Sequence, residues 1–135
     1  MDIYERLMQR QKENQPFLDF IGAVSEEVGP GRAVITLKPR PEHMNYRGIV
    51  HGGCLFTLAD SAAGLAASSR GRCIVTLSSS FNYLLPAKDT EKIIAEATEV
   101  KYGRTIAVYD VTVKSHEGKL LCKGTVDYYV LGENV

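Results

Sequence analysis

Residues 51–69 read HGGCLFTLADSAAGLAASS, the longest segment of small and apolar residues in the chain. Its length and its content of Ala and Leu favour a helix over a strand. Apolar or small side chains occupy nearly every side of such a helix, which is typical of a helix buried on most of its surface. The segment therefore predicts one central helix around which the rest of the chain packs.

Segments rich in Val, Ile, Thr and Tyr predict strands on both sides of this helix. Four follow it, at residues 73–85, 92–102, 105–114 and 119–131, and in the third of them Ala107, Tyr109, Val111 and Val113 share one face. Two precede it, at residues 17–28 and 31–38, joined by a Gly-Pro-Gly turn. The connections near Gly103 and Gly118 are of hairpin length, so the strands that they join must be antiparallel.

Residues 2–14 predict a short N-terminal helix, because Asp2 followed by Glu5 is typical of a capping box. About six antiparallel strands and one apolar helix pack most economically when the sheet wraps around the helix. This α+β arrangement is called the hotdog fold. A chain of 135 residues is long enough for one core and too short for two, so residues 1–135 predict a single domain.

Charge and composition exclude several classes of partner. Sixteen Lys and Arg balance sixteen Asp and Glu, and this zero net charge argues against nucleic acid. No apolar stretch is long enough to span or anchor in a membrane, and the N-terminus lacks the apolar core of a secretory signal. Three widely spaced cysteines without a CxxC pair indicate the reducing cytoplasm. A neutral chain with an open sheet edge favours a homodimer.

Asp60 is the one acidic residue in the apolar helix. An ionised carboxylate on a buried helix costs several kcal/mol unless it is paired or hydrogen-bonded. Departures from local rules of this kind tend to mark functional sites. The structural alternative is that Asp60 faces a subunit interface, where it bonds to Ser or Asn.

His51, Gly52 and Gly53 stand where this helix begins. Glycines are poor helix formers, so two in succession indicate that a ligand or another backbone approaches closely. A helix N-terminus also presents free N–H groups, which can stabilise the oxyanion of an acyl-transfer transition state. A turn that merely leads into the helix is the structural alternative.

Gly53 and Asp60 are seven residues apart, so they lie on one side of the helix and about 10 Å apart along it. An oxyanion donor and a base must both act on the same reacting carbon, within about 3 Å of their target atoms. A two-fold dimer with antiparallel helices would bring the helix start of one chain to Asp60 of the other. The spacing therefore predicts an active site shared between two chains.

The pattern Asn45-x5-His51-Gly52-Gly53-x6-Asp60 resembles the signature of the PaaI-like hotdog acyl-CoA thioesterases. The resemblance includes the segment from Thr76 to Pro86 and covers roughly residues 17–130. It implies hydrolysis of an acyl-CoA to a free acid and CoA. The acyl group would be aryl- or hydroxyaryl-acetyl, or a medium or long chain.

The resemblance also implies roles for individual residues. Asp60 would be the general base or the nucleophile, and the sequence does not distinguish the two. The N–H of Gly52 would polarise the thioester carbonyl, with Gly53 beside it, and Asn45 would position the carbonyl or the lytic water. His51 would support the loop, and Ser78 would assist the acid or the water. Tyr46 and Phe56 are candidates for the acyl pocket.

CoA carries phosphates that need cations, and the candidates in loops or at strand ends are Arg47, Lys88, Lys101 and Arg104. No cofactor beyond the CoA of the substrate is required. The three histidines lack the spacing of metal ligands, so no zinc site is expected. The resemblance further implies that homodimers pair into a homotetramer.

Two other functions remain compatible with such a fold. A hotdog acyl-CoA dehydratase pairs a loop His with a helix acid in a different local motif. A non-catalytic acyl-CoA-binding protein would act as a sensor, but 135 residues leave no room for a DNA-binding output module.

Overall fold

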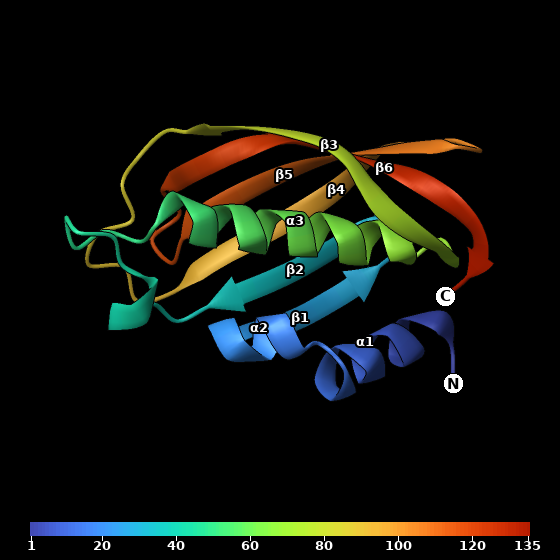
Figure 1. The fold of residues 1–135 in the computed structure, drawn as a ribbon, viewed down its shortest axis with the longest axis horizontal. Helices are drawn as coiled ribbons and strands as arrows, with labels where there is room; N and C mark the ends of the chain where they lie inside the picture. Colours follow the sequence, from blue (N-terminus) through green and yellow to red (C-terminus); the bar gives the residue numbers. More distant parts are fainter.

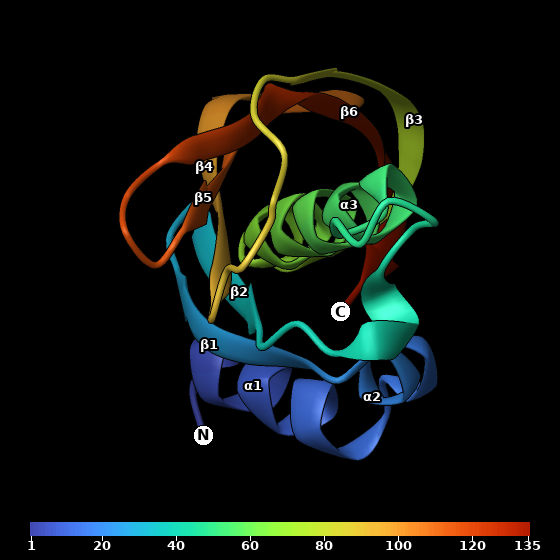
Figure 2. The ribbon, with the colours of Figure 1, turned by 90° about the vertical axis from the view of Figure 1, so that its left-hand side faces the viewer.

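The computed structural model describes residues 1–135 and places the helix α3 (Gly52–Ser68) in the hollow of one curved sheet (Figures 1 and 2). Six strands follow one another across the sheet in the order β1–β2–β4–β5–β6–β3, and all neighbours are antiparallel. They are β1 (Ala23–Gly29), β2 (Arg32–Leu37), β3 (Arg72–Tyr83), β4 (Ile93–Tyr102), β5 (Ile106–Ser115) and β6 (Leu120–Asn134). The predicted hotdog fold is confirmed.

Two short helices, α1 (Ile3–Glu13) and α2 (Pro16–Ile21), pack against β1 (Figure 2). The capping box of α1 is confirmed, because Asp2 and Glu5 each accept the backbone N–H of the other. The strand predicted over residues 17–28 is wrong in its first part, which forms α2. Pro16 suits the first position of a helix, where no N–H is needed, and Gly22 ends the helix at a φ of 86°. The strand therefore begins only at Ala23.

The core lies between α3 and the concave face of the sheet. The small residues of α3 let the helix approach the strands closely, and Ala59, Ala62, Ala63, Ala66 and Ala67 are fully buried. The alternation predicted for β5 is confirmed, and the face that carries Ala107, Tyr109, Val111 and Val113 is the inner one, because all four are inaccessible to solvent. No helix has both the length and the apolar character needed to cross a membrane.

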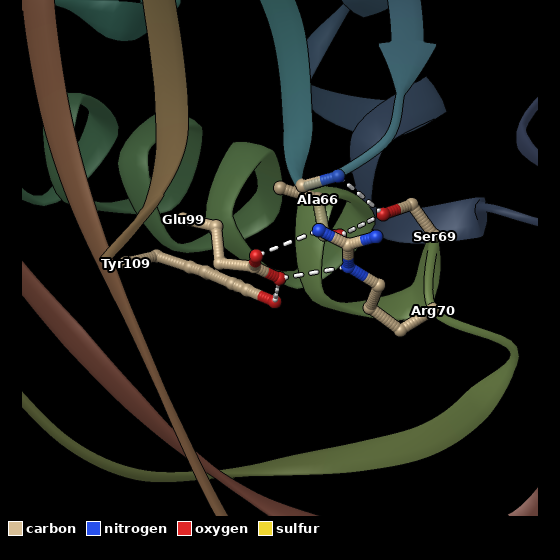
Figure 3. Close-up of polar contacts among 6 residues, drawn as sticks. Ala66, Ser69, Arg70, Glu99 and Tyr109 are labelled. Atoms are coloured by element: carbon tan, nitrogen blue, oxygen red, sulfur yellow. Dashed lines mark hydrogen bonds and ion pairs between the residues drawn. The ribbon is translucent and has the colours of Figure 1, made fainter. Parts of the chain in front are cut away.

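A polar cluster ties the C-terminal end of α3 to the sheet (Figure 3). Arg70 donates two hydrogen bonds to Glu99 on β4, at 2.9 and 2.7 Å, and the buried Tyr109 on β5 donates a third at 3.2 Å. Ser69 donates to the carbonyl of Ala66 and accepts the N–H of Gly31. The cluster joins the helix end to β4, β5 and the β1–β2 turn. It thereby sets where along the sheet the other residues of α3 lie.

Candidate active site

His51 is the N-cap of α3, and its Nδ1 accepts the N–H of Gly53 at 2.8 Å. A Cβ on Gly53 would lie only 3.0 Å from that Nδ1, so the glycine makes room for the cap. The N–H of Gly52 donates no hydrogen bond within the chain. Together with the positive end of the helix dipole, this free N–H makes Gly52 available to an oxyanion.

The loop before α3 is shaped by Asn45. Its side-chain oxygen accepts the N–H groups of Arg47 and Ile49, at 2.9 and 3.4 Å. Asn45 and Gly52 line the same cavity of about 290 Å³. Its remaining walls come from Ile49, Val50, Leu55, Tyr83, Leu84, Leu85, Pro86 and Ala87. The structure thus brings two of the predicted residues together at the start of the helix, beside a mostly apolar space.

Asp60 lies about two turns further along α3 and is partly buried. Its Oδ1 is 3.2 Å from the hydroxyl of Thr76 on β3 and 3.2 Å from that of Tyr128 on β6, and both hydroxyls donate to it. The Tyr128 hydroxyl also lies 2.8 Å from the carbonyl oxygen of Asp60. The predicted cost of a carboxylate on this helix is therefore offset by two O–H donors.

Asp60 opens onto a second cavity, of about 380 Å³, between α3, β3 and the N-terminal helices. The polar side chains on its wall, besides those already bonded to Asp60, are Arg10, Gln11, Gln15, Ser61, Ser68 and Cys73. Neither Gly52 nor Asn45 lines this cavity. Within one chain, the proposed oxyanion donor and the proposed base therefore face different spaces.

Neither Thr76 nor Tyr128 is among the site residues that the sequence predicts. The hydroxyl expected to assist the acid was that of Ser78, which instead donates to Asp127 at 2.7 Å. A bulge between Thr76 and Ser78 shifts the register of β3 against β6, so Thr76 pairs with Tyr128 and Ser78 with Asp127. The one available sequence signal for Tyr128 was its place on the inward-facing side of a strand, since a buried Tyr hydroxyl needs a partner.

The other predicted binding residues are less closely grouped. Tyr46 is 96 % exposed, and Phe56 packs edge-on against Phe81; neither lines the two cavities. The predicted phosphate-binding cations are all exposed and none forms an ion pair within the chain: Arg47, Lys88, Lys101 and Arg104. Arg47 and Lys88 flank residues of the Gly52 cavity. Arg104 lies in the β4–β5 turn, at the end of the sheet opposite to the loops that carry Arg47 and Lys88 (Figure 1).

The histidines show no arrangement that would bind a metal ion. His43 is buried, with Nδ1 accepting the N–H of Arg40 and Nε2 donating to the carbonyl of Ile21. No group of three or more His, Cys, Asp and Glu residues is placed to hold a metal.

Residues 47–122, more than half of the chain, match the sequence model of a family described as the thioesterase superfamily. The match spans α3 with both Gly52 and Asp60, and it continues through β5. The chain belongs to the thioesterase superfamily. Among its relatives, human acyl-coenzyme A thioesterase 13 is 35% identical over 98 residues, which are 70% of this chain and 70% of that protein.

Two solved structures share the fold of this thioesterase-superfamily chain. The PaaI protein of E. coli has the same fold, with a TM-score of 0.91 over 98% of this chain and 99% of that one, at 24% identity. A hypothetical thioesterase of Streptococcus pneumoniae, solved with coenzyme A, is 38% identical, with a TM-score of 0.79 over 84% of this chain and 88% of that one. The acyl-coenzyme A thioesterase PaaI of E. coli is also 28% identical in sequence over 107 residues, which are 79% of this chain and 76% of that protein, so the resemblance to PaaI-like hotdog thioesterases is confirmed.

Proposed function

We propose that this chain hydrolyses acyl-CoA thioesters to a free acid and CoA. It is an enzyme, an acyl-CoA thioester hydrolase. The observation that carries the proposal is the pairing, on one helix, of an unbonded N–H at Gly52 with a carboxylate at Asp60. Family membership and a relative solved with coenzyme A support the same substrate class. The acyl group is aryl- or hydroxyaryl-acetyl, or a medium or long chain.

The chemistry follows from what these two groups can do. The N–H of Gly52 stabilises the negative charge that develops on the thioester carbonyl oxygen. Asp60 either takes a proton from the attacking water or attacks the carbonyl carbon itself. In both routes the C–S bond breaks, the acyl carbon gains the oxygen of water, and the CoA thiolate leaves and takes up a proton. Asn45, beside Gly52, positions the carbonyl or the water.

The active site is shared between two copies of the chain. Gly52 and Asp60 open onto different cavities, and a two-fold axis with antiparallel α3 helices brings each to its counterpart in the other copy. The strand β3 ends the sheet with an unpaired edge of twelve residues, along which Val75 and Leu77 are 48% and 43% exposed. Such an edge invites pairing with a second copy.

The same arrangement groups the cations that bind the CoA phosphates. Antiparallel helices bring the β4–β5 turn of one copy, which carries Arg104, to the end of the other copy that carries Arg47 and Lys88. These homodimers pair into tetramers, and the enzyme works in the cytoplasm with no cofactor beyond the CoA of its substrate. The three cysteines, none of which forms a disulfide, support that compartment.

Release of free CoA thiol from a panel of acyl-CoAs tests the activity. The panel contains aryl-acetyl, short, medium and long acyl groups and one 3-hydroxyacyl-CoA. Asp60→Ala should lower kcat at least 100-fold, because it removes the base or nucleophile. Asp127→Ala, which removes a nearby carboxylate bonded to Ser78, is the matched control and should retain activity. Thiol release from no member of the panel, or an enoyl product from the 3-hydroxyacyl-CoA, would contradict the proposal.

Mixed dimers test whether the site is shared. Neither an Asp60→Ala chain nor a Gly52→Pro chain should form a working site alone, since Pro removes the N–H. A mixture that exchanges subunits should regain one working site per mixed dimer. That site takes Gly52 from the Asp60→Ala chain and Asp60 from the Gly52→Pro chain. If the mixture is no more active than the two parent variants, the proposal of a shared site is wrong.

A further inference from the structure

We infer that Tyr128 is a positioning residue for Asp60: with Thr76 it holds one carboxylate oxygen, so that the other is left to react. The inference rests on the proposed function, because it assigns the reacting atom of the same carboxylate. Both hydroxyls donate to Oδ1 of Asp60, whereas Oδ2 accepts no hydrogen bond within the chain. Asp60 lines the larger cavity, from which a substrate or water can approach its carboxylate.

The two donors arrive from neighbouring strands at matched positions. Thr76 on β3 and Tyr128 on β6 are register partners, so both side chains project to the same face, toward α3. They lie 16 and 68 residues from Asp60 in the chain, and only the pairing of β3 with β6 joins them. The pair of hydroxyls that holds the Asp60 carboxylate, here called the clamp (Thr76 and Tyr128), therefore depends on the pairing of β3 with β6 and does not arise from the helix itself.

Tyr128 is held firmly enough to direct another side chain. Its side chain is 1% exposed, and its ring packs against that of Tyr109 with centroids 6.1 Å apart. Tyr109 is tied in turn to Glu99 and, through it, to Arg70. The Tyr128 hydroxyl shares its proton between the carbonyl oxygen of Asp60, at 2.8 Å, and Oδ1 at 3.2 Å. It thus fixes the side chain relative to its own backbone.

The hydroxyl stays a donor at neutral pH. Burial raises the pKa of Tyr128 far above its usual range, and the nearby Asp60 carboxylate raises it further. The other titratable or charged groups around this position are Tyr109 on β5, Cys73 on β3 and Arg10 on α1. The last two line the same cavity as Asp60. A hydroxyl that stays protonated keeps donating to Asp60 and so restricts the rotation of the carboxylate.

Tyr128→Phe tests the inference, since it keeps the ring and removes only the hydroxyl. We expect kcat for acyl-CoA hydrolysis to fall about ten-fold or more while KM changes less than about two-fold, because the carboxylate is misplaced and CoA binding is untouched. Tyr129→Phe removes an exposed hydroxyl one residue away and should behave like the wild type.

Thr76 gives a second pair of variants that does not disturb the core, because Thr76 is exposed. Thr76→Val should lower kcat with little change in KM, and Thr76→Ser, which keeps the hydroxyl, should restore it. A kcat in Tyr128→Phe equal to that of Tyr129→Phe would overturn the inference, as would a Thr76→Ser variant as slow as Thr76→Val. Far-ultraviolet circular dichroism confirms that each variant is folded.

A thermal unfolding cycle separates this inference from the proposed function. It compares Asp60→Ala, Tyr128→Phe and the double variant, and it needs no activity. We expect the effect of Tyr128→Phe on Tm to be smaller in the Asp60→Ala background than in the wild type, because its carboxylate partner is gone. Strictly additive effects would overturn the clamp. Failure of the wild type to release thiol from any acyl-CoA, with non-additive effects in the cycle, would contradict only the proposed function.

Discussion

Gly52 and Gly53 differ in what lies beside their α-carbons. A methyl group on Gly53 would meet Nδ1 of His51 at 3.0 Å, whereas one on Gly52 would meet only the ring of Tyr83, at 3.6 Å. The glycine at 53 is thus explained by the N-cap of its own helix. At 52 no close contact requires glycine, and the feature that matters there is the unbonded backbone N–H.

This difference predicts unequal effects of alanine at the two positions. Gly53→Ala should displace His51 and weaken the cap, which lowers the free energy of unfolding by about 1 kcal/mol. Gly52→Ala should leave it unchanged or slightly higher, because Ala is the better helix former and has room. Thermal or denaturant unfolding measures both. Equal effects at the two positions would show that the His51 contact does not matter to the helix.

The helix α3 is held at its two ends by different means. Its N-terminal end carries the His51 cap, and its C-terminal end is fixed to β4 and β5 by Arg70, Glu99 and Tyr109 (Figure 3). The hydrogen bonds from Arg70 lower the pKa of Glu99 below its ordinary value of 4.5. Protonation of this one side chain therefore loosens the link between helix and sheet.

The lowered pKa of Glu99 predicts a pH dependence of stability. A carboxyl whose folded pKa is lowered contributes stability that is fully present above the unfolded value and is lost as the pH falls through the folded one. Between pH 6 and pH 3, Arg70→Met should therefore lose less stability than the wild type, because its Glu99 lacks the partner. Arg104→Met, which removes an unpaired exposed cation, should follow the wild-type curve in chemical denaturation. Superimposable curves for all three proteins would contradict the role of the Arg70–Glu99 pair.

The molecule as a whole has one long free edge. β3 pairs only with β6, its residues Val75 and Leu77 are exposed, and Val75 also lines the cavity of Asp60. The two proposed reactive groups also face different cavities of one chain. The proposed dimer would account for both features, because a second copy would pair with the free edge and bring the two groups together.

A charge on that edge should separate the copies. Leu77→Arg places a cation where β3 meets its counterpart, and we expect sedimentation velocity to show the wild type at twice the mass of one chain or more and the variant at a smaller mass. Thiol release should fall with it, because the shared site is lost. Val24→Arg, on the opposite edge strand and 53% exposed, should keep both the assembly and the activity. A Leu77→Arg variant that stays assembled would move the interface away from β3.

Local patterns were sufficient for most of the elements. The apolar content of α3, the capping box at Asp2 and the alternation of β5 each depend on residues a few positions apart, and all three are confirmed. The segment 17–21 shows where such patterns fail. Its Phe, Leu and Ile residues suit a strand, but Pro16 and Gly22 at its ends and its packing against β1 favour the six-residue helix α2.

The amino-acid sequence alone was enough to single out His51, Gly52 and Asp60. Glycines are poor helix formers and a carboxylate is costly on an apolar helix, and both departures can be recognised from neighbouring residues alone. The partners of Asp60 depended on the folded sheet. A bulge in β3 assigns Thr76 to the carboxylate and Ser78 to Asp127, and the register with β6 brings Tyr128 from 68 residues away. Register and bulges result from the packing of distant strands against one core, and a local pattern carries no information about that balance.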